Sequence, residues 1–280
     1  MVLGHEGVGV VEAVGPEVKY LKQGDRVGWG YENDSCGHCL ECLQGCETFC
    51  PKRELYGGAN TDQGSFASHA VWREAFLHPI PDGMSDEAAA PLQCGGATTF
   101  TALHGVKPSE TVGIMGVGGL GHLAIQFAAK MGCRVVVLSG TDSKKAQSLQ
   151  LGAHEFIATK GKEADALSVS APINRLLVTT SAQPIWEQIL PLMAPRSVIY
   201  PLSVSMSNFE IPYMPLILQG IAIQGSLVAP RSLHRQMLEF AARHGIAPVV
   251  EKFPMTEAGI EDAMDRLEAG DVQFRAVLMN

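Results

Sequence analysis

The pattern of apolar and polar positions divides the chain into regions of different periodicity. Residues 7–30 alternate short β-branched runs with glycine and proline, which is typical of antiparallel, barrel-like β structure. Residues 65–81 repeat this strand pattern, and Ser85 is a plausible N-cap for a helix over 86–90. Residues 33–64 follow neither period and are rich in Cys, Gly, Asn and Asp, so we expect a long loop that needs a specific reason to be ordered.

From about residue 111 onward, short apolar strands alternate with helices. The expected strands cover 111–117, 133–139, 174–181, 197–202 and 221–227. The expected helices cover 119–131, 143–151 and 185–193. This alternation predicts a doubly wound parallel sheet. The tail is expected to form helices over 232–244 and 256–269 and a last strand in RAVLM.

A glycine-rich turn lies between the first strand and the first helix of this region. It reads G-V-G-G-L-G and comprises Gly116, Val117, Gly118, Gly119, Leu120 and Gly121. Glycines here allow a tight turn and let backbone N–H groups approach a pyrophosphate at a helix N-terminus. A glycine pattern alone is weak evidence, and a purely structural turn is the alternative. The strand–turn–helix context favours a dinucleotide site.

The end of the second strand indicates which dinucleotide is bound. An NAD site has an acidic residue there, which accepts hydrogen bonds from the ribose 2′-OH. This chain instead offers Ser139, Thr141, Ser143 and Lys144. Hydroxyl donors and a cation favour a 2′-phosphate, so we expect NADP(H). The alternative is that Lys144 is a solvated helix residue, and Asp142 keeps that interpretation open.

A cysteine cluster in the 33–64 loop predicts a metal site. Cys36, Cys39, Cys42 and Cys50 are spaced C-x2-C-x2-C-x7-C, and four thiolates at this spacing can enclose one zinc ion tetrahedrally. A disulfide framework would spread its cysteines more evenly. We do not expect Cys46 to bind the metal, because it fits the spacing less well. We do not expect His38 to bind it either, because four thiolates already complete the coordination.

Composition limits the classes of partner. The formal net charge is −8, from 21 basic and 29 acidic residues, which argues against nucleic acid or an anionic membrane as the main partner. No secretory signal is visible, and no window has enough uninterrupted apolar residues to span a membrane. We therefore expect a cytoplasmic protein.

His5, Glu6 and Cys94 are weaker candidates for metal ligands, because their spacing in the sequence does not show that they meet. His5 and Glu6 lie just before the first strand, and Cys94 lies in PLQCGGATTF. His5 could be a surface residue and Cys94 a small buried hydrophobe. The remaining histidines are expected to be structural or on the surface. Trp29 is the best tryptophan candidate to border a substrate pocket.

Several motifs together resemble one family. GHEGVGVVEAVGPEV, GDRVG, the four-cysteine loop, PLQCGGATTFTAL, GVGGLGHLAIQFAAKMG and the terminal AVLMN are similar to the zinc-dependent medium-chain dehydrogenase/reductase superfamily, in its cinnamyl alcohol dehydrogenase-like branch. The resemblance runs through essentially the whole chain. It implies an α/β fold with a Rossmann doubly wound parallel sheet and a GroES-like β-barrel catalytic domain, with a cleft between them. The expected division is 1–92 (catalytic domain, with the zinc loop 33–64), 93–228 (Rossmann domain) and 229–280 (return to the catalytic domain).

The resemblance also implies roles for individual residues. His5 and Cys94 would bind a catalytic zinc, and Glu6 would be a carboxylate able to approach the same metal. Ser139, Thr141, Ser143 and Lys144 would lie near the adenosine 2′-phosphate. The implied reaction is hydride transfer between NADP(H) and a primary alcohol or aldehyde, of cinnamyl type or otherwise aromatic, in a homodimer.

The chain departs from the family in one respect. Members carry a further N-terminal segment with another cysteine ligand of the catalytic zinc, and nothing here matches it. We expect Met1 to be an internal residue of a longer ancestral chain and the barrel to lack its first strands. The alternative function is a catalytically inactive, zinc-stabilised NADP-binding subunit or regulator. A zinc-free quinone or enoyl reductase is disfavoured by the four-cysteine loop.

Overall fold

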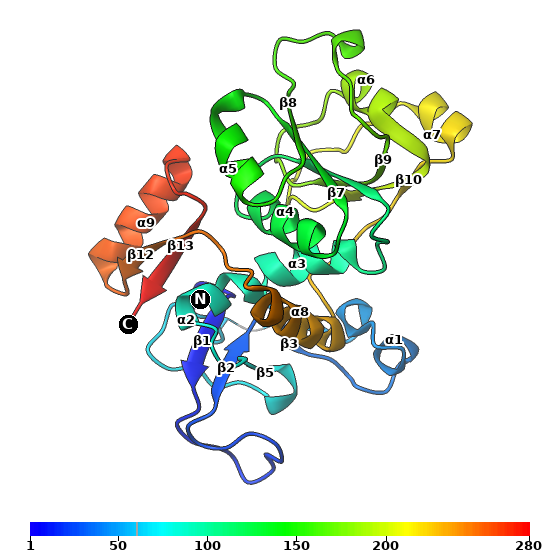
Figure 1. The fold of residues 1–280 in the computed structure, drawn as a ribbon. Helices are drawn as coiled ribbons and strands as arrows, with labels where there is room; N and C mark the ends of the chain where they lie inside the picture. Colours follow the sequence, from blue (N-terminus) through cyan, green and yellow to red (C-terminus); the bar gives the residue numbers. More distant parts are fainter. Residues whose placement is uncertain (60) are drawn as a thin grey trace. The chain divides into compact units, whose positions relative to one another are not determined.

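The computed structural model describes residues 1–59 and 61–280, and it divides into two compact units. The first unit joins Met1–Ala97 to Leu227–Asn280, and the second is Thr98–Ser226. In Figure 1 the first unit therefore contains both the blue start and the orange-to-red end of the chain.

The second unit is built on a parallel sheet in the strand order β11-β10-β9-β6-β7-β8. Its strands are β6 (Thr111–Met115), β7 (Arg134–Ser139), β8 (Glu155–Ala158), β9 (Ile173–Val178), β10 (Met193–Pro201) and β11 (Ala222–Ile223). The chain winds outward from β6 in one direction through β7 and β8, and then in the other direction through β9, β10 and β11. This is the doubly wound Rossmann arrangement that the alternating pattern predicts.

The strands of this sheet are apolar because helices cover them. The helices of this part of the chain are α3 (Gly95–Leu103), α4 (Gly121–Lys130), α5 (Lys145–Gln150), α6 (Trp186–Ile189) and α7 (Tyr213–Gln219). Val112, Ile114, Val136 and Leu176 have no measurable exposure. Strands buried on both faces read as continuous apolar runs, which explains TVGIM and RVVVLS.

The described residues of the first unit form small sheets of two or three strands. β1 (Gly7–Val10), β2 (Arg26–Trp29) and β5 (His78–Pro79) pair antiparallel in the order β1-β2-β5. β3 (Glu32–Asp34) pairs antiparallel with β4 (Glu54–Leu55), and β12 (Val250–Pro254) pairs in parallel with β13 (Arg275–Met279). The helices are α1 (Leu40–Leu43), α2 (Asp86–Ala89), α8 (Arg231–His244) and α9 (Glu257–Ala269). Within the described residues, β1 and β13 each keep one free edge.

Some elements differ from the sequence-based expectation. Residues 65–73 carry a strand pattern but lie outside any strand. Conversely, β8, β12 and α7 were not anticipated. β8 has only four residues, and β12 carries two charges and ends in proline. α7 reads YMPLILQ, an apolar run without a polar face, and such a run does not distinguish a helix from a strand.

Within the described part of the chain, no helix is both long enough and apolar enough to cross a bilayer.

Candidate functional site

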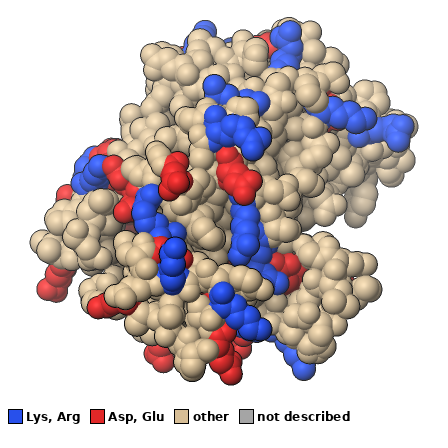
Figure 2. Space-filling model, turned by 60° about the horizontal axis from the view of Figure 1, so that its bottom comes forward, with Lys and Arg blue, Asp and Glu red and all other residues tan. Residues whose placement is uncertain are grey.

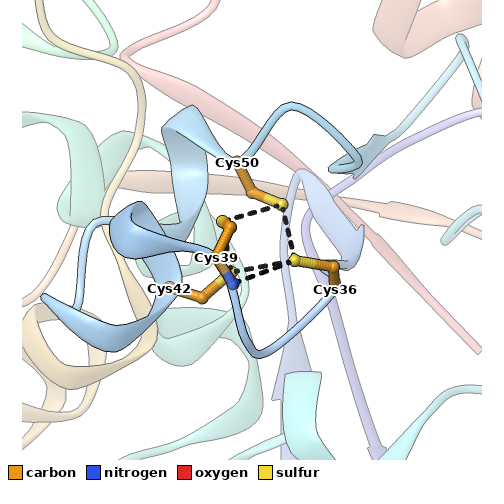
Figure 3. A group of neighbouring side chains, drawn as sticks. All are labelled: Cys36, Cys39, Cys42 and Cys50. Atoms are coloured by element: carbon orange, nitrogen blue, oxygen red, sulfur yellow. Dashed lines mark hydrogen bonds between the residues drawn. The ribbon is translucent and has the colours of Figure 1, made fainter.

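The four predicted zinc ligands of the cysteine loop converge on one point. Figure 3 shows their side chains pointing toward one another, with the sulfurs of Cys36, Cys39, Cys42 and Cys50 all within 4.8 Å of each other. Four of the Sγ–Sγ distances are 3.5, 3.6, 3.7 and 3.9 Å. Zinc–sulfur bonds of about 2.3 Å in a tetrahedron separate the sulfurs by about 3.8 Å. The spacing of the four sulfurs therefore fits a tetrahedral zinc ion.

Local backbone geometry supplies charge stabilisation to this cluster. Backbone N–H groups of His38 and Cys39 lower the pKa of the Cys36 thiol to about 6. The Cys39 N–H lies 3.4 Å from the Cys36 sulfur, and the Lys52 N–H lies 3.3 Å from the Cys50 sulfur. A thiol must lose its proton before it binds metal, so donors aimed at the sulfurs favour ligation.

The two other candidates in the loop lie outside this set. His38 is exposed, and its Nδ1 is 2.7 Å from the carbonyl oxygen of Cys36. Cys46 is the N-terminal neighbour of a 3₁₀ turn at Glu47–Phe49 and does not belong to the group of converging sulfurs.

Glu47, inside the cysteine loop, is a buried acid that no sequence pattern singles out. It is 3% exposed, and its Oε1 accepts hydrogen bonds from the backbone N and the Nε of Arg231, both at 2.8 Å. Desolvation opposes its ionisation, but the Arg231 hydrogen bonds outweigh this effect and lower its pKa.

His5 and Glu6 occupy defined positions in the first unit. The His5 ring packs against Tyr31 and Tyr56, with ring centroids 5.3 and 5.1 Å away. Burial lowers the pKa of His5 and so favours the neutral imidazole, which is the form that binds metal. Glu6 accepts a hydrogen bond at 3.0 Å from the backbone N of Gly95, the residue after Cys94.

Glu6 also forms an ion pair with Arg275 of β13. The structure thus places the Glu6 carboxylate beside the segment that carries Cys94, although the two residues are far apart in sequence. Among the described residues, the four cysteines form the group of ligand atoms close enough to hold one ion, and His5, Glu6 and Cys94 do not form a second such group.

A hollow of about 1290 Å³ opens in the first unit beside these residues. It is lined by β1, the segment 65–72, α9 and β13, and it includes His5 and Glu6. Trp29 and Trp72 line it as well, with ring centroids 5.6 Å apart. The hollow borders the free edges of β1 and β13, where further strands could pair.

The glycine turn of the second unit has the geometry that a pyrophosphate needs. Gly116 has φ +95°, a backbone conformation that residues with a Cβ rarely adopt. A Cβ on Gly121 would lie 2.0 Å from the carbonyl oxygen of Gly116, so glycine is required for the turn to close on α4. A Cβ on Gly118 would meet open space, which leaves this part of the turn accessible to a ligand.

The residues expected near the 2′-phosphate lie close to this turn. Lys144 Nζ donates a hydrogen bond of 2.7 Å to the carbonyl oxygen of Val117, which joins the lysine to the glycine turn. Ser139 ends β7, and the hydroxyls of Thr141 and Ser143 are 2.9 Å apart. Lys144 therefore lies beside the glycine turn, and Ser139, Thr141 and Ser143 lie at or just after the end of β7, which pairs with β6.

Comparison with known proteins finds family matches in both units. The family model described as the alcohol dehydrogenase GroES-like domain matches residues 1–82, and the zinc-binding dehydrogenase model matches residues 119–243. An alcohol dehydrogenase of Geobacillus stearothermophilus is 36% identical over 282 residues, covering 99% of this chain and 82% of its own. This chain belongs to the zinc-dependent medium-chain dehydrogenase/reductase superfamily.

Other comparisons place it in the cinnamyl alcohol dehydrogenase-like branch of this superfamily. Cinnamyl alcohol dehydrogenase 8 of Arabidopsis thaliana is 34% identical, over 99% of this chain and 79% of its own. The solved structure of a cinnamyl alcohol dehydrogenase from Sorghum bicolor matches with a TM-score of 0.91 and 31% identity, over 99% of this chain and 81% of its own. A Helicobacter pylori relative, solved in complex with NADP(H), matches with a TM-score of 0.88 and 26% identity, over 99% of this chain and 81% of its own.

The surface charge of this dehydrogenase is mixed on the face drawn in Figure 2. Acidic and basic side chains alternate there and do not gather in a field of one sign. Such a face gives no concentrated attraction for a polyanion.

Sequence reasoning missed a set of buried polar residues in the catalytic unit of this dehydrogenase. The set contains Glu47, Gln93, His78 and His234, each less than 5% exposed, and Glu47 pairs with the partly exposed Arg231. His234 Nε2 is 3.0 Å from Gln93 Oε1. His234 and Gln93 are 141 positions apart in sequence, and Arg231 and Glu47 are 184 apart. No local sequence pattern could therefore have indicated these contacts.

Proposed function

We propose that the chain catalyses reversible hydride transfer between NADP(H) and an alcohol or aldehyde, at a zinc ion held by His5, Cys94 and Glu6. The observation that carries the proposal is the Glu6–Gly95 hydrogen bond, which holds a carboxylate beside the Cys94 segment. The relatives described above, named alcohol and cinnamyl alcohol dehydrogenases, support the substrate class.

Each residue would have a distinct task at this site. His5 would supply a neutral imidazole, kept in that form by burial among tyrosine rings. Cys94 would supply a thiolate, and Glu6 a carboxylate whose charge Arg275 balances in this structure. When bound, the zinc ion acts as a Lewis acid that polarises the substrate oxygen.

The preference for NADP(H) is part of the proposal. Ser139 ends β7 where an NAD site would carry an acid, and Lys144 provides a cation beside the glycine turn. A carboxylate at position 139 would repel a 2′-phosphate, whereas the hydroxyls of Ser139, Thr141 and Ser143 can donate to one. The NADP(H) complex of the Helicobacter pylori relative is consistent with this preference.

The decisive experiment measures turnover and metal content together. The purified chain, supplied with zinc, is mixed with NADPH and cinnamaldehyde, and the loss of reduced-nicotinamide absorbance is followed. We expect zinc-dependent turnover that Cys94→Ser abolishes and Cys46→Ser leaves intact. Two zinc ions per chain with turnover support the enzyme. One zinc ion per chain, with NADPH binding and no turnover, supports the inactive NADP-binding subunit instead.

We also propose that the chain forms a homodimer through the β11 edge of the Rossmann sheet. α7 and its surroundings expose large apolar side chains, among them Tyr213, Ile217 and Leu218 at 82, 67 and 77%. Exposed apolar patches of this kind mark interaction surfaces. Light scattering after size-exclusion chromatography tests the assembly. We expect a dimer for the unmodified chain and a monomer for Leu218→Glu.

A further inference from the structure

We propose that helix α8 mechanically couples the cysteine loop to the Cys94 segment, through Arg231 at its first turn and His234 one turn later. Both contacts lie within the first unit. The proposal rests on the geometry of α8 and holds whether or not Cys94 binds a catalytic zinc.

The first contact joins α8 to the cysteine loop. Glu47 lies between Cys42 and Cys50, and its carboxylate accepts two hydrogen bonds of 2.8 Å from Arg231, the first residue of α8. The Arg231 guanidinium also lies over the ring of the buried Phe76, 4.8 Å from its centre. The Glu47 carboxylate is 3% exposed and the Arg231 side chain 32% exposed. Two hydrogen bonds to the buried carboxylate leave this pair little freedom to slide, so movement of the loop displaces the start of α8.

The second contact joins α8 to the residue before Cys94. His234 is 3% exposed, its Nε2 is 3.0 Å from Gln93 Oε1, and its ring stacks on His78 with centroids 3.8 Å apart. Gln93 Nε2 donates in turn to the carbonyl oxygen of Ala89 at 3.1 Å. The imidazole is therefore held on both sides.

Gln93 is packed too closely to remain in place if His234 moves. A Cβ on Gly28 would lie 2.4 Å from the Gln93 side chain, and a Cβ on Gly30 would lie 2.5 Å from its carbonyl oxygen. Two glycines thus allow β2 and its continuation to press directly on Gln93. Because the position is so closely packed, a shift of His234 passes to the peptide that joins Gln93 to Cys94.

The spacing of the two contacts makes α8 suitable for this role. Residues three apart on a helix share one face, and Arg231 and His234 are three apart. α8 spans Arg231–His244, so both contacts belong to one continuous helix. Rigid helices and packed hydrogen-bonded side chains carry coupling between separate sites. The helix therefore links zinc retention in the loop to the local structure around Cys94.

The test compares Glu47→Gln with a matched control. Glu251→Gln removes the same charge from an acid that also accepts a backbone N–H, from Gln273 at 2.7 Å, and pairs with an arginine, Arg266 at 2.5 Å. Zinc release to a chromogenic chelator is measured in a Cys94→Ser background, so that the four-thiolate site alone is followed. Alkylation of Cys94 by iodoacetamide is measured by peptide mass spectrometry in the otherwise unmodified chain.

We expect Glu47→Gln to speed zinc release by about tenfold or more, because the loop loses the charged acceptor of its two hydrogen bonds from Arg231. Cys94 alkylation should accelerate as well, while Glu251→Gln changes neither rate. Arg231→Lys keeps the charge but loses the Nε donor, and it should show a smaller effect in the same direction. This variant also serves if Glu47→Gln fails to fold.

A double-mutant cycle identifies α8 as the route. His234→Phe keeps a ring on His78 and removes the hydrogen bond to Gln93. If α8 carries the coupling, Glu47→Gln has little further effect on Cys94 alkylation in the His234→Phe background. The proposal is overturned by an equal effect in both backgrounds, by unchanged Cys94 alkylation, or by zinc release no faster than in Glu251→Gln.

Discussion

His234 lies nearly flat against His78, with ring centroids 3.8 Å and ring planes 14° apart, and both side chains are under 5% exposed. Desolvation lowers the pKa of His234 to about 3 and, together with the neighbouring His234, Arg235 and Arg231, lowers that of His78 well below its ordinary value. The lowered pKa values favour the neutral form of both rings in the folded protein.

This pair predicts acid destabilisation with a definite sign. The unfolded histidines gain protons below about pH 6.5, whereas the folded ones do not, so the unfolded state binds more protons. Stability is fully present above that pH and falls as the pH drops toward about 3. We expect a slope of up to about 1.4 kcal/mol per pH unit for each ring. Urea unfolding at pH 7, 6 and 5 with excess zinc checks this, and His234→Phe should show the shallower slope.

Glu32 predicts the opposite pH dependence. Burial raises its pKa to about 8, with the charge of Glu47 adding to the effect and Arg231 and Arg53 opposing it. The unfolded carboxyl loses its proton above about pH 4.5 and the folded one only near pH 8, so this group destabilises the fold as the pH rises between those values. We expect Glu32→Gln to remove a loss of roughly 1.4 kcal/mol per pH unit over that window. Melting temperatures of the unmodified chain and of Glu32→Gln are measured from pH 5 to 9. A difference between them that does not change with pH would count against this prediction.

The cysteine cluster predicts a zinc-dependent stability. Cys50→Ser removes the ligand that has no measurable exposure and should lower the zinc content by one ion per chain. We expect a loss on the order of 3 kcal/mol, or roughly 10 °C in Tm, because a structural zinc contributes folding energy directly. Cys46→Ser, a change in the same loop outside the converging set, should retain zinc and Tm. Metal analysis and calorimetry measure both quantities, and loss of zinc from Cys46→Ser would contradict the assignment.

The cofactor preference depends on Lys144 and Ser139. Lys144→Ala should raise the KM for NADPH by roughly 10- to 100-fold, the cost of about 1.5–3 kcal/mol for a hydrogen bond to a charged group. Ser139→Asp should shift the preference toward NADH, because a carboxylate repels the 2′-phosphate and accepts from a 2′-OH. Lys145→Ala is the matched control, since Lys145 is the next residue along the chain and opens α5. Equal losses in the two lysine variants would remove Lys144 from the cofactor site.

Short-range chemistry in this chain was predictable from sequence. Four cysteines within 15 positions can reach one another because so little chain separates them, and the sulfurs do converge. The glycine turn was equally predictable, because Gly116 and Gly121 are constrained by backbone sterics that act within a few residues. The doubly wound sheet followed from the alternation of apolar strands with helices.

Long-range polar contacts were not predictable. Glu47 and Arg231 meet across 184 positions, and neither is one of the residues that define a motif. The sequence left open whether His234 is structural or on the surface, because its burial depends on β5 and on Gln93, which a sequence pattern does not bring near it. The strand prediction for residues 65–73 was wrong for a related reason. The segment has a strand pattern, but it pairs with no strand among the described residues.

The ion pair between Glu6 and Arg275 has a consequence for biosynthesis. Its partners are 269 positions apart, and the unit that contains them is interrupted by the whole of Thr98–Ser226. On the ribosome, the interrupting unit emerges as one uninterrupted stretch and can fold early. Glu6, which directly precedes β1, gains its ion-pair partner only once Arg275 of β13 has been translated. Pausing or premature termination in the last fifty codons should therefore leave a folded nucleotide-binding unit attached to an unfinished, chaperone-dependent one.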